Sequence, residues 1–419
     1  MADRALIAEI LCTGEELLLG DIVNTNAAFL SARLTDLGIC VYHHSVVGDD
    51  PRRLGECVEE GLSRSDIVII SGGLGPTKDD LTKETVAALF GREMKLHEPS
   101  LADIKSYFER TGRTMSKNNE KQAMMPEGAI VFPNHFGTAP ALALERDSKS
   151  VIMLPGPPSE LIPLFCEQAE PYLRTKINQA IVSKNIHIFG MGESAIAEKI
   201  DELLIDTPSL TAATYCKEGE VRIRITARAE TESLAAELCE EHAQKIMRSE
   251  VGGFAYGVDV GTIENAVVTA LHQKGLTLSA AESCTGGLIA KRITDISGCS
   301  DVFFGGCVTY TNDVKHRLIG VKEETLERYG AVSEQTAREM ARGVRLATGS
   351  DIGISTTGVA GPTGGTAETP VGTVFIGIST SEGESVRRLS LSSMRSREYI
   401  RQASATNAFD MVLKAILLK

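Results

Sequence analysis

The sequence predicts an α/β protein in which a small α+β module joins two three-layer α/β domains. The chain has 419 residues, too many for one ordinary hydrophobic core, so about two or three domains are expected. Strand and helix signals alternate over residues 5–170 and again over residues 258–419, as they do in βαβ units on a parallel sheet. Residues 175–255 show a different pattern, with half-buried strands beside two helices. The expected domains are residues 1–172, 173–256 and 257–419.

The first α/β domain contains the clearest buried strand. The run Asp66-Ile-Val-Ile-Ile-Ser71 is apolar throughout its centre, which is typical of a parallel strand covered on both faces. The other expected strands are residues 6–11, 39–47 and 151–154, and the expected helices are residues 26–37, 51–64 and 82–90.

The module and the last domain show the same kinds of signal. In the module, Val221, Ile223 and Ile225 alternate with polar residues and indicate a half-buried strand. The strands expected there are residues 181–189 and 220–229, and the helices are residues 196–204 and 234–246. In the last domain the expected strands are residues 276–280, 302–310, 351–357, 372–379 and 385–391, and the expected helices are residues 287–294, 314–319, 333–348 and 397–418.

Composition limits the classes of function. A hydrophobic share of 42% and a charged share of 24% are ordinary for a soluble globular protein. The net charge of −13 and the lack of Trp argue against a nucleic-acid-binding surface and a membrane surface, so small molecules are the expected partners. No long apolar run or signal peptide is found, which makes the cytoplasm the expected location. The nine cysteines form no C-x-x-C pair and the eight histidines show no metal-ligand spacing, so reduced thiols are expected.

A glycine-rich loop follows the buried strand and continues to Thr77. Gly72, Gly73 and Gly75 allow backbone N–H groups to approach a phosphate closely. The loop therefore predicts a phosphate or nucleotide site.

Carboxylates follow three of the expected strands. Asp80 ends the glycine-rich loop, Asp49 follows the strand at 39–47, and Glu15 and Glu16 follow the first strand. Because the carboxyl ends of parallel strands meet at one edge of a sheet, these side chains are expected to share a site. Asp79 and Asp80 can hold a hard cation there that bridges phosphate oxygens. The alternative is that Asp80 only caps the following helix.

This region resembles the molybdopterin-binding fold of the MoaB and MogA type. The resemblance rests on residues 72–80 (Gly-Gly-Leu-Gly-Pro-Thr-Lys-Asp-Asp), 48–51 (Gly-Asp-Asp-Pro) and 155–161 (Pro-Gly-Pro-Pro-Ser-Glu-Leu). The run from Thr13 to Asn26 narrows it to the N-terminal half of the CinA (competence/damage-inducible) family. The resemblance implies that ADP-ribose is hydrolysed to AMP and ribose 5-phosphate with a divalent metal cation.

Within that resemblance, Asp80 and Asp49 act at the metal site, and the identity of the metal is left open. The alternative is a non-catalytic domain that binds a pterin or a nucleotide, in an accessory protein of competence or DNA damage.

The resemblance also implies a KH-like module in the middle of the chain. Residues 175–255 contain no Gly-x-x-Gly loop, which clamps the nucleic-acid backbone in KH domains. Arg222 and Arg224 alternate with apolar residues, so both are expected on the solvated face of a strand. A structural spacer or a dimer contact is therefore favoured over RNA binding.

The run from Ala281 to Gly287 (Ala-Glu-Ser-Cys-Thr-Gly-Gly) is the most informative in the chain. It lies between an expected strand and an expected helix, a corner that exposes small polar side chains and aims unpaired N–H groups at a bound group. Ser283 is the expected nucleophile, provided that a base takes its proton. Cys284 is the rival, and it is disfavoured because its side chain points away from that of Ser283 in an extended segment.

A lysine is the candidate base, since no histidine has a credible triad arrangement. Lys315 lies one turn into the helix after the strand that ends near Tyr310, so both can face one pocket. Desolvation lowers the pKa of an ammonium group and turns it into a base. A Ser–Lys pair with a Tyr as proton relay is a known arrangement for amide hydrolysis. The alternative is that Lys315 is a solvated helix residue.

A second glycine-rich loop, residues 356–366, follows another apolar strand. Its hydroxyl groups and glycines, among them Thr357 and Gly361, can hold a phosphate or form an oxyanion hole, but a wide turn has the same composition. Arg397 begins the last helix and can bind a phosphate bidentately, or remain a surface charge.

Together these residues resemble the C-terminal CinA domain, the nicotinamide-nucleotide amidase (PncC) family. The resemblance rests on residues 281–287, Tyr310 with Lys315, residues 357–362, residues 370–374 and Arg397. It implies that nicotinamide mononucleotide (NMN) is hydrolysed to nicotinate mononucleotide and ammonia, without a cofactor.

Carried over to this sequence, the resemblance makes Ser283 the nucleophile and Lys315 and Tyr310 the groups that move protons. The implied substrate-binding residues are Thr357, Arg397, Gly286, Gly287 and Gly361. Ser396 departs from the acidic or amide residue usual before the arginine. The whole resemblance implies a bifunctional hydrolase of pyridine-nucleotide salvage, and both parent folds suggest a homodimer.

Overall fold

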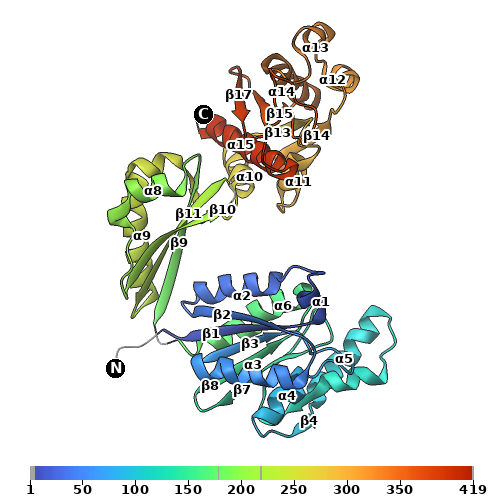
Figure 1. Ribbon diagram of the computed structural model, residues 1–419, viewed down its shortest axis with the longest axis vertical. Helices are drawn as coiled ribbons and strands as arrows, with labels where there is room; N and C mark the ends of the chain where they lie inside the picture. The colour runs from blue at the N-terminus through green and yellow to red at the C-terminus, as the bar shows by residue number, and fades with distance from the viewer. Residues whose placement is uncertain (1–4, 178, 218, 418–419) are drawn as a thin grey trace. The chain divides into compact units, whose positions relative to one another are not determined.

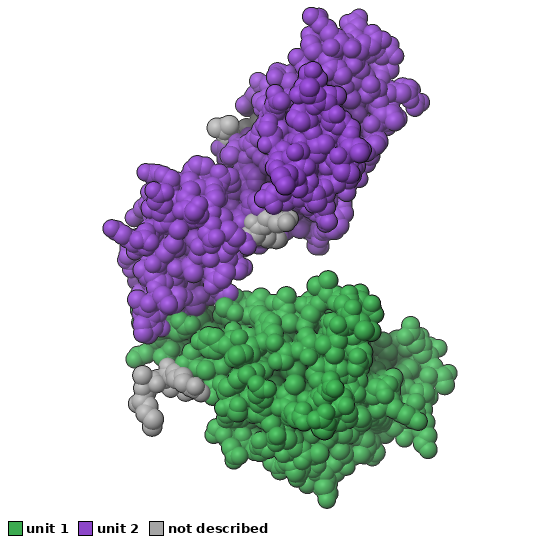
Figure 2. All heavy atoms as spheres, in the orientation of Figure 1, with its two compact units in different colours: residues 1–182, 228–235 green, residues 183–227, 236–419 purple. Residues whose placement is uncertain are grey.

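The computed structural model describes residues 5–177, 179–217 and 219–417. The chain divides into two compact units, which Figure 2 distinguishes by colour. Unit 1 holds residues 1–182 and 228–235, and unit 2 holds residues 183–227 and 236–419.

The N-terminal domain contains a six-stranded sheet with the order β2-β1-β3-β8-β7-β6. Its strands are β1 (Ile7–Thr13), β2 (Cys40–Val47), β3 (Ile67–Ser71), β6 (Ile130–Phe132), β7 (Ala141–Arg146) and β8 (Lys149–Leu154). The first four in the sheet order run parallel, and β7 and β6 are added antiparallel. A separate pair joins β4 (Met94–Leu96) to β5 (Met124–Pro126).

Helices cover both faces of this sheet, as Figure 1 shows. They are α1 (Glu15–Leu19), α2 (Thr25–Asp36), α3 (Pro51–Arg64), α4 (Thr82–Leu89), α5 (Glu98–Thr111), α6 (Pro158–Leu164) and α7 (Glu170–Arg174), with the short helices η1 (Lys117–Ala123) and η2 (Phe165–Ala169). Along β1, Ala8 and Ile10 pack in one core with α2 and α6, whereas Leu11 packs in a second core with α3 and α4. This alternation fixes the register of β1, because a slip of one residue would exchange the two cores.

The middle module contains a four-stranded sheet with the order β10-β11-β9-β12. Its elements are β9 (Ala180–Phe189), α8 (Glu193–Lys199), η3 (Asp201–Leu203), β10 (Leu210–Lys217), β11 (Glu220–Ala229), α9 (Glu232–Arg248), η4 (Glu250–Phe254) and β12 (Ala255–Val258). Val221, Ile223 and Ile225 are buried along β11, in agreement with the predicted alternation.

One prediction for this module is wrong. Arg222 is exposed as expected, but Arg224 is 8% exposed and does not lie on a solvated face. The neighbouring strand β9 covers Arg224, whose guanidinium donates hydrogen bonds to the hydroxyl groups of Ser183 (3.2 Å) and Thr226 (3.3 Å). These hydroxyl groups accept hydrogen bonds from a guanidinium that the sequence pattern alone predicts to be solvent-exposed.

The C-terminal domain contains a five-stranded sheet with the order β14-β13-β15-β16-β17. Its strands are β13 (Leu278–Glu282), β14 (Phe303–Val308), β15 (Ile352–Gly358), β16 (Thr373–Ser379) and β17 (Glu384–Ser390). β13 pairs in parallel with β14 and β15, and the last two strands are antiparallel. The helices are α10 (Ile263–Lys274), α11 (Leu288–Thr294), η5 (Cys299–Asp301), α12 (Asn312–Ile319), α13 (Glu323–Tyr329), α14 (Glu334–Thr348) and α15 (Arg397–Leu417).

Two cores make this domain three-layered as well. Val267, Ile289 and Phe409 join α10, α11 and α15 to one face of the sheet, and Met340 and Val344 of α14 pack on the other face. Because β13, β14 and β15 are parallel, their carboxyl ends meet at one edge. That edge brings together the segments that the sequence analysis singled out.

The predicted α/β fold class is confirmed, but several elements were not predicted, among them the helix α5 and the strands β7 and β10. β4, β5 and β6 have three residues each, too few for a recognisable alternation. In the described residues, no helix has both the length and the apolar character needed to cross a membrane.

Two glycines inside helices are expected to respond in opposite ways to alanine. A Cβ at Gly343 in α14 would overlap the carbonyl oxygen of Ile319, whereas one at Gly55 in α3 would lie 3.7 Å from the Thr85 Cγ2 atom. Gly55→Ala is therefore expected to stabilise by about 0.5–1 kcal/mol, and Gly343→Ala to destabilise by about 1–3 kcal/mol. Thermal unfolding of the two variants measures both effects, and a stabilised Gly343→Ala protein would contradict the packing of α14 against the end of α12.

Candidate active site

Ser283 lies at a sharp corner between β13 and α11. Its amide donates a hydrogen bond to the carbonyl oxygen of Thr356 (2.9 Å), so the corner is tied to the neighbouring strand β15. Gly286 and Gly287 then take positive φ angles of 61° and 95° and turn the chain into α11. Positive φ favours glycine, which explains the glycine pair at this point of the sequence. The Ser283 side chain remains 9% exposed at the carboxyl edge of the sheet.

The carboxylate of Glu282 occupies the N-terminus of α11. It accepts hydrogen bonds from the amides of Gly287 (2.9 Å), Ile289 (3.1 Å) and Ala290 (2.9 Å), and the residue is 1% exposed. The prediction that this turn aims unpaired N–H groups at a bound group is therefore wrong for these three amides. A negative side chain from the preceding strand neutralises the positive end of the helix.

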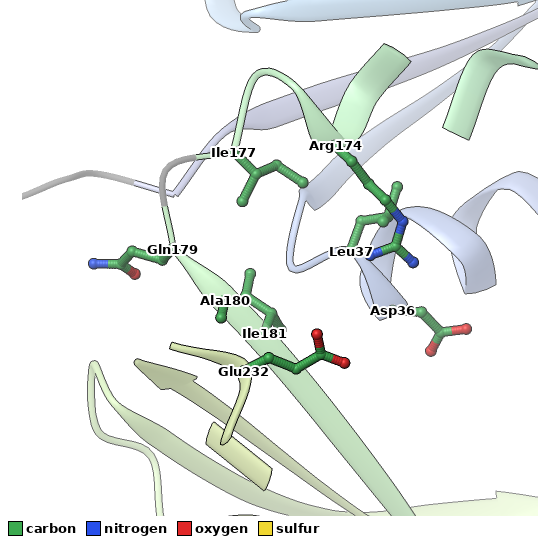
Figure 3. Close-up of a pocket in the computed structure, with 8 residues that line it drawn as sticks. All are labelled: Asp36, Leu37, Arg174, Ile177, Gln179, Ala180, Ile181 and Glu232. Carbon is green, nitrogen blue, oxygen red and sulfur yellow. The ribbon is translucent and has the colours of Figure 1, made fainter. Parts of the chain in front are cut away.

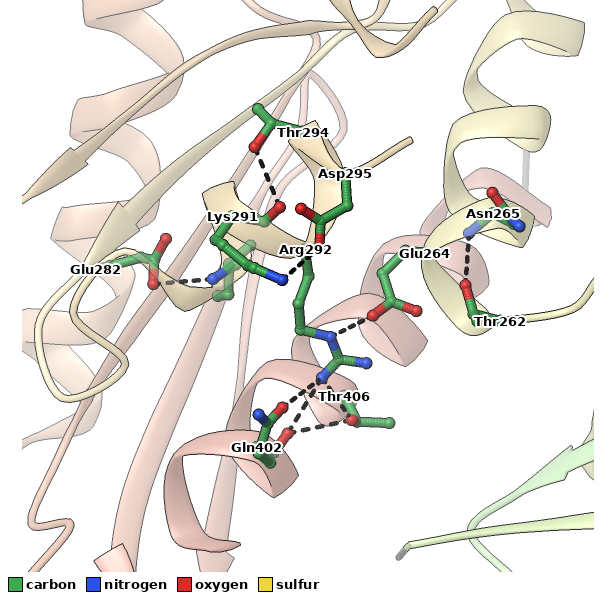
Figure 4. Close-up of polar contacts among 11 residues, drawn as sticks. Thr262, Glu264, Asn265, Glu282, Lys291, Arg292, Thr294, Asp295, Gln402 and Thr406 are labelled. Carbon is green, nitrogen blue, oxygen red and sulfur yellow. Dashed lines mark hydrogen bonds and ion pairs between the residues drawn. The ribbon is translucent and has the colours of Figure 1, made fainter. Parts of the chain in front are cut away.

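Arg292 fixes the other end of α11, as Figure 4 shows. It forms an ion pair with Glu264 of α10 and donates a hydrogen bond to the Thr406 hydroxyl of α15 (2.9 Å). The corner that carries Ser283 is thus held on one side by Glu282 and on the other by Arg292.

The Lys315 amine lies directly beside the Ser283 hydroxyl. Its Nζ atom is 3.1 Å from the Ser283 Oγ atom, 2.8 Å from the Thr309 carbonyl oxygen and 3.4 Å from the Tyr310 carbonyl oxygen. Lys315 projects from α12 and is 1% exposed, so it is not the solvated helix residue of the alternative interpretation. Burial lowers the pKa of Lys315 below the ordinary lysine value.

These contacts suit a neutral amine. A neutral amine has two N–H donors, which the carbonyl oxygens of Thr309 and Tyr310 can accept. The lone pair then remains for the hydroxyl proton of Ser283. The arrangement can therefore activate a serine without histidine.

Cys284 is buried away from this pair. Its side chain is 6% exposed, and burial raises the pKa of its thiol to about 12. Since only the thiolate is a strong nucleophile, the geometry favours Ser283 over Cys284.

Tyr310 and Arg397 meet at the rim of the site. The Arg397 guanidinium donates to the Tyr310 hydroxyl oxygen (3.3 Å) and to the Gly361 carbonyl oxygen (2.8 Å). Tyr310 is 60% exposed, and it is its carbonyl oxygen, not its hydroxyl, that contacts Lys315. The second glycine-rich loop is thereby joined to the strand that leads to Lys315.

Thr357 lies at the same edge with its hydroxyl already engaged. Its Oγ1 atom donates a hydrogen bond to the Ala331 carbonyl oxygen (2.6 Å), and the residue is 1% exposed. Gly361 has a φ of 75°, and a Cβ there would lie 2.6 Å from Val371. The loop is therefore shaped by packing as well as by any ligand.

In the N-terminal domain, the glycine-rich loop folds onto its own carboxylate. Asp80 accepts hydrogen bonds from the Thr77 amide (2.9 Å) and the Thr77 hydroxyl (2.6 Å). A Cβ at Gly75 would lie 2.5 Å from the Asp80 carboxylate, so a larger residue at this position would displace Asp80 from Thr77. Lys121, which the sequence analysis did not select, donates to the carbonyl oxygens of Thr77 (2.9 Å) and Asp80.

Asp49 lies among other carboxylates at this edge. Burial raises the pKa of Asp49, and the negative charges of Glu16, Glu15 and Asp80 raise it further. A bound cation would relieve this repulsion. In the described ranges, no group of three or more His, Cys, Asp or Glu has a metal-binding arrangement. A cation at this edge would be held by one or two carboxylates, and water and substrate phosphates would complete its shell.

A cavity of about 330 Å³ opens beside these carboxylates. Asn26 spans it by donating to the Ser71 hydroxyl oxygen (2.9 Å) and the Gly156 carbonyl oxygen (2.7 Å). Asn26 and Thr13 line the cavity, and the Asn26 Oδ1 and Thr13 Oγ1 atoms are buried without a hydrogen-bond partner in the described part of the chain. Unpartnered polar atoms in two residues of one cavity wall suit a polar ligand.

A smaller cavity of about 120 Å³ lies at the opposite edge of this domain, near the ends of α2 and α7 (Figure 3). Arg174 in its wall forms an ion pair with Glu170 (2.9 Å), a carboxylate that also pairs with Arg33 (2.5 Å). None of the predicted site residues lines this cavity.

Family models match the chain in three consecutive segments. Residues 9–175 match a "Probable molybdopterin binding domain", residues 183–257 a "Damage-inducible protein CinA KH domain", and residues 260–416 a "CinA C-terminal domain". The chain is thus a three-domain protein of molybdopterin-binding-like, KH-like and CinA C-terminal parts.

Relatives match over the whole chain. A CinA-like protein of Kosmotoga olearia is 47% identical over 410 residues, which cover 98% of this chain and 99% of that protein. A CinA-like protein of Dictyoglomus turgidum is 47% identical with coverage of 98% and 99%. The crystal structure of competence/damage inducible protein CihA from Agrobacterium tumefaciens is 41% identical, covers 37% of this chain and 93% of that chain, and has a TM-score of 0.36. The chain belongs to the CinA family.

Proposed function

We propose that the C-terminal domain is a serine amidohydrolase that converts NMN to nicotinate mononucleotide and ammonia. The observation that carries this proposal is the buried Lys315 amine at 3.1 Å from the Ser283 hydroxyl. Membership of the CinA family supports a hydrolase, and the resemblance to the amidase family supplies the substrate.

In the first half of the reaction, the Ser283 proton moves to the neutral Lys315 amine while Oγ attacks the carboxamide carbon. The C–N bond then breaks, and the proton passes from Lys315 to the leaving nitrogen, which departs as ammonia. The positive pyridinium ring makes the carboxamide more electrophilic. Glu282 already occupies the amides of Gly287, Ile289 and Ala290. The oxyanion is therefore assigned to the preceding turn at residues 284–286.

In the second half, water attacks the ester on Ser283. Lys315 takes the proton of this water and returns it to the serine oxygen as nicotinate mononucleotide leaves. The Tyr310 carbonyl oxygen helps to orient the Lys315 amine, whereas the Tyr310 hydroxyl accepts a hydrogen bond from Arg397 at the rim of the site.

Ser283→Ala is expected to abolish ammonia release, with a loss of about 10⁴-fold or more, because no acyl-enzyme can form. Cys284→Ala is the matched control and is expected to retain most of the activity, since its thiol is buried and protonated. Ammonia release from NMN measures both. The reverse pattern would transfer the nucleophile to the thiol, and no turnover by the parent protein would refute the amidase.

For the N-terminal domain we propose hydrolysis of the pyrophosphate of ADP-ribose. Asp49 would hold a divalent cation, which would neutralise phosphate charge when bound. Asp80 shapes the glycine-rich loop through Thr77, and the cavity beside Asn26 takes the nucleoside part of the substrate.

Asp49→Asn is expected to lower AMP production by more than about 100-fold. Loss of a residue that contacts only a metal ligand costs up to about that much, and loss of a ligand itself costs more. Asp50→Asn is the control, because the Asp50 side chain caps α3 by accepting a hydrogen bond from the Arg53 amide. A chelator is expected to act like Asp49→Asn and to leave ammonia release unchanged. Tight nucleotide binding without AMP production would favour the alternative, a binding domain without turnover.

A further inference from the structure

The amidase substrate carries a phosphate that needs a binding site near Ser283. The N-terminus of α11 does not offer one, because the buried Glu282 carboxylate already accepts its amides. A phosphate placed there would face a fixed negative charge. The phosphate must therefore bind to positive side chains on another element.

Helix α15 places two arginines toward the Ser283 corner. Arg397 and Arg401 are four residues apart, so their side chains lie on one face of the helix. Arg401 donates from Nε (3.1 Å) and Nη2 (2.6 Å) to the Thr285 carbonyl oxygen, two residues after the nucleophile. A Cβ at Gly286 would lie 3.6 Å from the Arg401 Nη2 atom, so this guanidinium lies on the corner itself.

Both guanidinium groups keep their charge available. Their partners are neutral oxygens: Gly361 and Tyr310 for Arg397, and Thr285 for Arg401. In the portion of the chain that the structure describes, neither forms an ion pair with a carboxylate, although the protein carries a net charge of −13. Arg292 and Arg387, by contrast, are neutralised by Glu264 and Asp410. Two unpaired cations beside a nucleophile suit a doubly charged anion.

We propose that Arg401 joins Arg397, which the family resemblance already implies as a substrate-binding residue, in binding the phosphate of the substrate, and that Arg401 determines the preference for a phosphorylated amide. This inference rests on the proposed amidase function. Arg401 uses its Nε and Nη2 atoms for Thr285, which leaves Nη1 for a phosphate oxygen. The contact with Thr285 also holds the Arg401 guanidinium at a fixed place relative to Ser283. Arg401 therefore favours substrates whose phosphate and amide are separated by the matching distance.

The competing explanation is that Arg401 only anchors α15 to the turn at residues 284–287. The two explanations differ in what happens to a substrate without a phosphate. A purely structural anchor affects every amide alike, whereas a phosphate-binding residue affects only the phosphorylated one.

The test compares NMN with nicotinamide riboside, which has the same amide and ring but no phosphate. Arg401→Gln is expected to lower kcat/KM for NMN by about 10- to 100-fold, mainly through KM, and to change that for the riboside by less than about threefold. Arg401→Lys is expected to recover part of the loss because it keeps the charge. Arg388→Gln is the control, since Arg388 lies on β17 and its guanidinium stacks over the Phe375 ring of β16.

An equal loss for both substrates would overturn the proposal, and so would an unchanged preference for NMN. Inorganic phosphate is expected to compete with NMN in the parent protein and more weakly in Arg401→Gln. If the protein releases no ammonia at all, calorimetric binding of NMN still tests the site. Binding that weakens in Arg401→Gln but not in Arg388→Gln supports it, and binding that ignores Arg401 overturns it.

Discussion

Lys315→Met is expected to reduce ammonia release from NMN by about 10⁴-fold, which is the upper range of what a positioned general base contributes. Methionine has nearly the length of lysine and tolerates the buried site, but it cannot take the Ser283 proton. Lys315→Arg is expected to fail as well, because a guanidinium stays protonated and is never a base at these pH values. Turnover is measured by ammonia release, and thermal unfolding verifies that each variant is folded.

Lys291→Met is the matched control. Lys291 lies on α11, close to the corner in sequence, but its side chain is 66% exposed and pairs with Asp295. Its loss is expected to change turnover little. If Lys315→Met retained the turnover of the Lys291→Met protein, the buried amine would not be the base.

The same lysine gives a pH dependence with a defined sign. The base must be neutral, and burial lowers the pKa of Lys315, so kcat/KM is expected to rise with pH through a midpoint below 10.5, the ordinary lysine value. Because the folded state disfavours the proton, the protein also loses stability as pH falls from the unfolded lysine value of 10.5 toward the lowered folded pKa, and it regains that stability as pH rises again. Lys315→Met removes this contribution, so the stability of the variant is expected to depend less on alkaline pH.

The sequence was sufficient to predict the Ser283–Lys315 pair because topology does most of the positioning. Ser283 follows β13, Lys315 follows the adjacent parallel strand β14, and both strands end at one edge of the sheet. The approach of the two side chains then follows from the strand order. The pairing of Ser283 with Lys315 therefore follows once β13 and β14 are recognised as adjacent parallel strands.

The partners of this pair were not predictable in the same way. A glutamate at the end of a strand gives no sign that it will cap the following helix, because that depends on the direction of the chain after Gly286 and Gly287. Arg401 reaches Thr285 over 116 positions of sequence, and no local pattern reports such a contact. Arg224 shows the opposite error, since alternation suggested exposure while a neighbouring strand buried it.

Glu282→Ala is expected to cost about 3 kcal/mol of folding stability and most of the amidase activity. The substitution leaves the amides of Gly287, Ile289 and Ala290 without their acceptor in a buried place, and each buried unpaired donor costs about 1–3 kcal/mol. Water that enters the space left by the carboxylate offsets part of this sum. The turn that sets the direction of the Ser283 side chain is then free to move.

Two further variants separate stability from positioning. Glu282→Gln keeps one acceptor oxygen but places an NH₂ group against the remaining amides, so an intermediate loss of stability and of kcat is expected, with KM for NMN nearly unchanged. Glu334→Ala removes a 54% exposed carboxylate from the first turn of α14 and is expected to stay within about 0.5 kcal/mol of the parent. Chemical denaturation gives the stabilities and ammonia release gives the kinetic constants. If Glu282→Ala matched Glu334→Ala in both measurements, the carboxylate would not hold the corner, and the direction of the Ser283 hydroxyl would have to come from Arg401 and Thr356 alone.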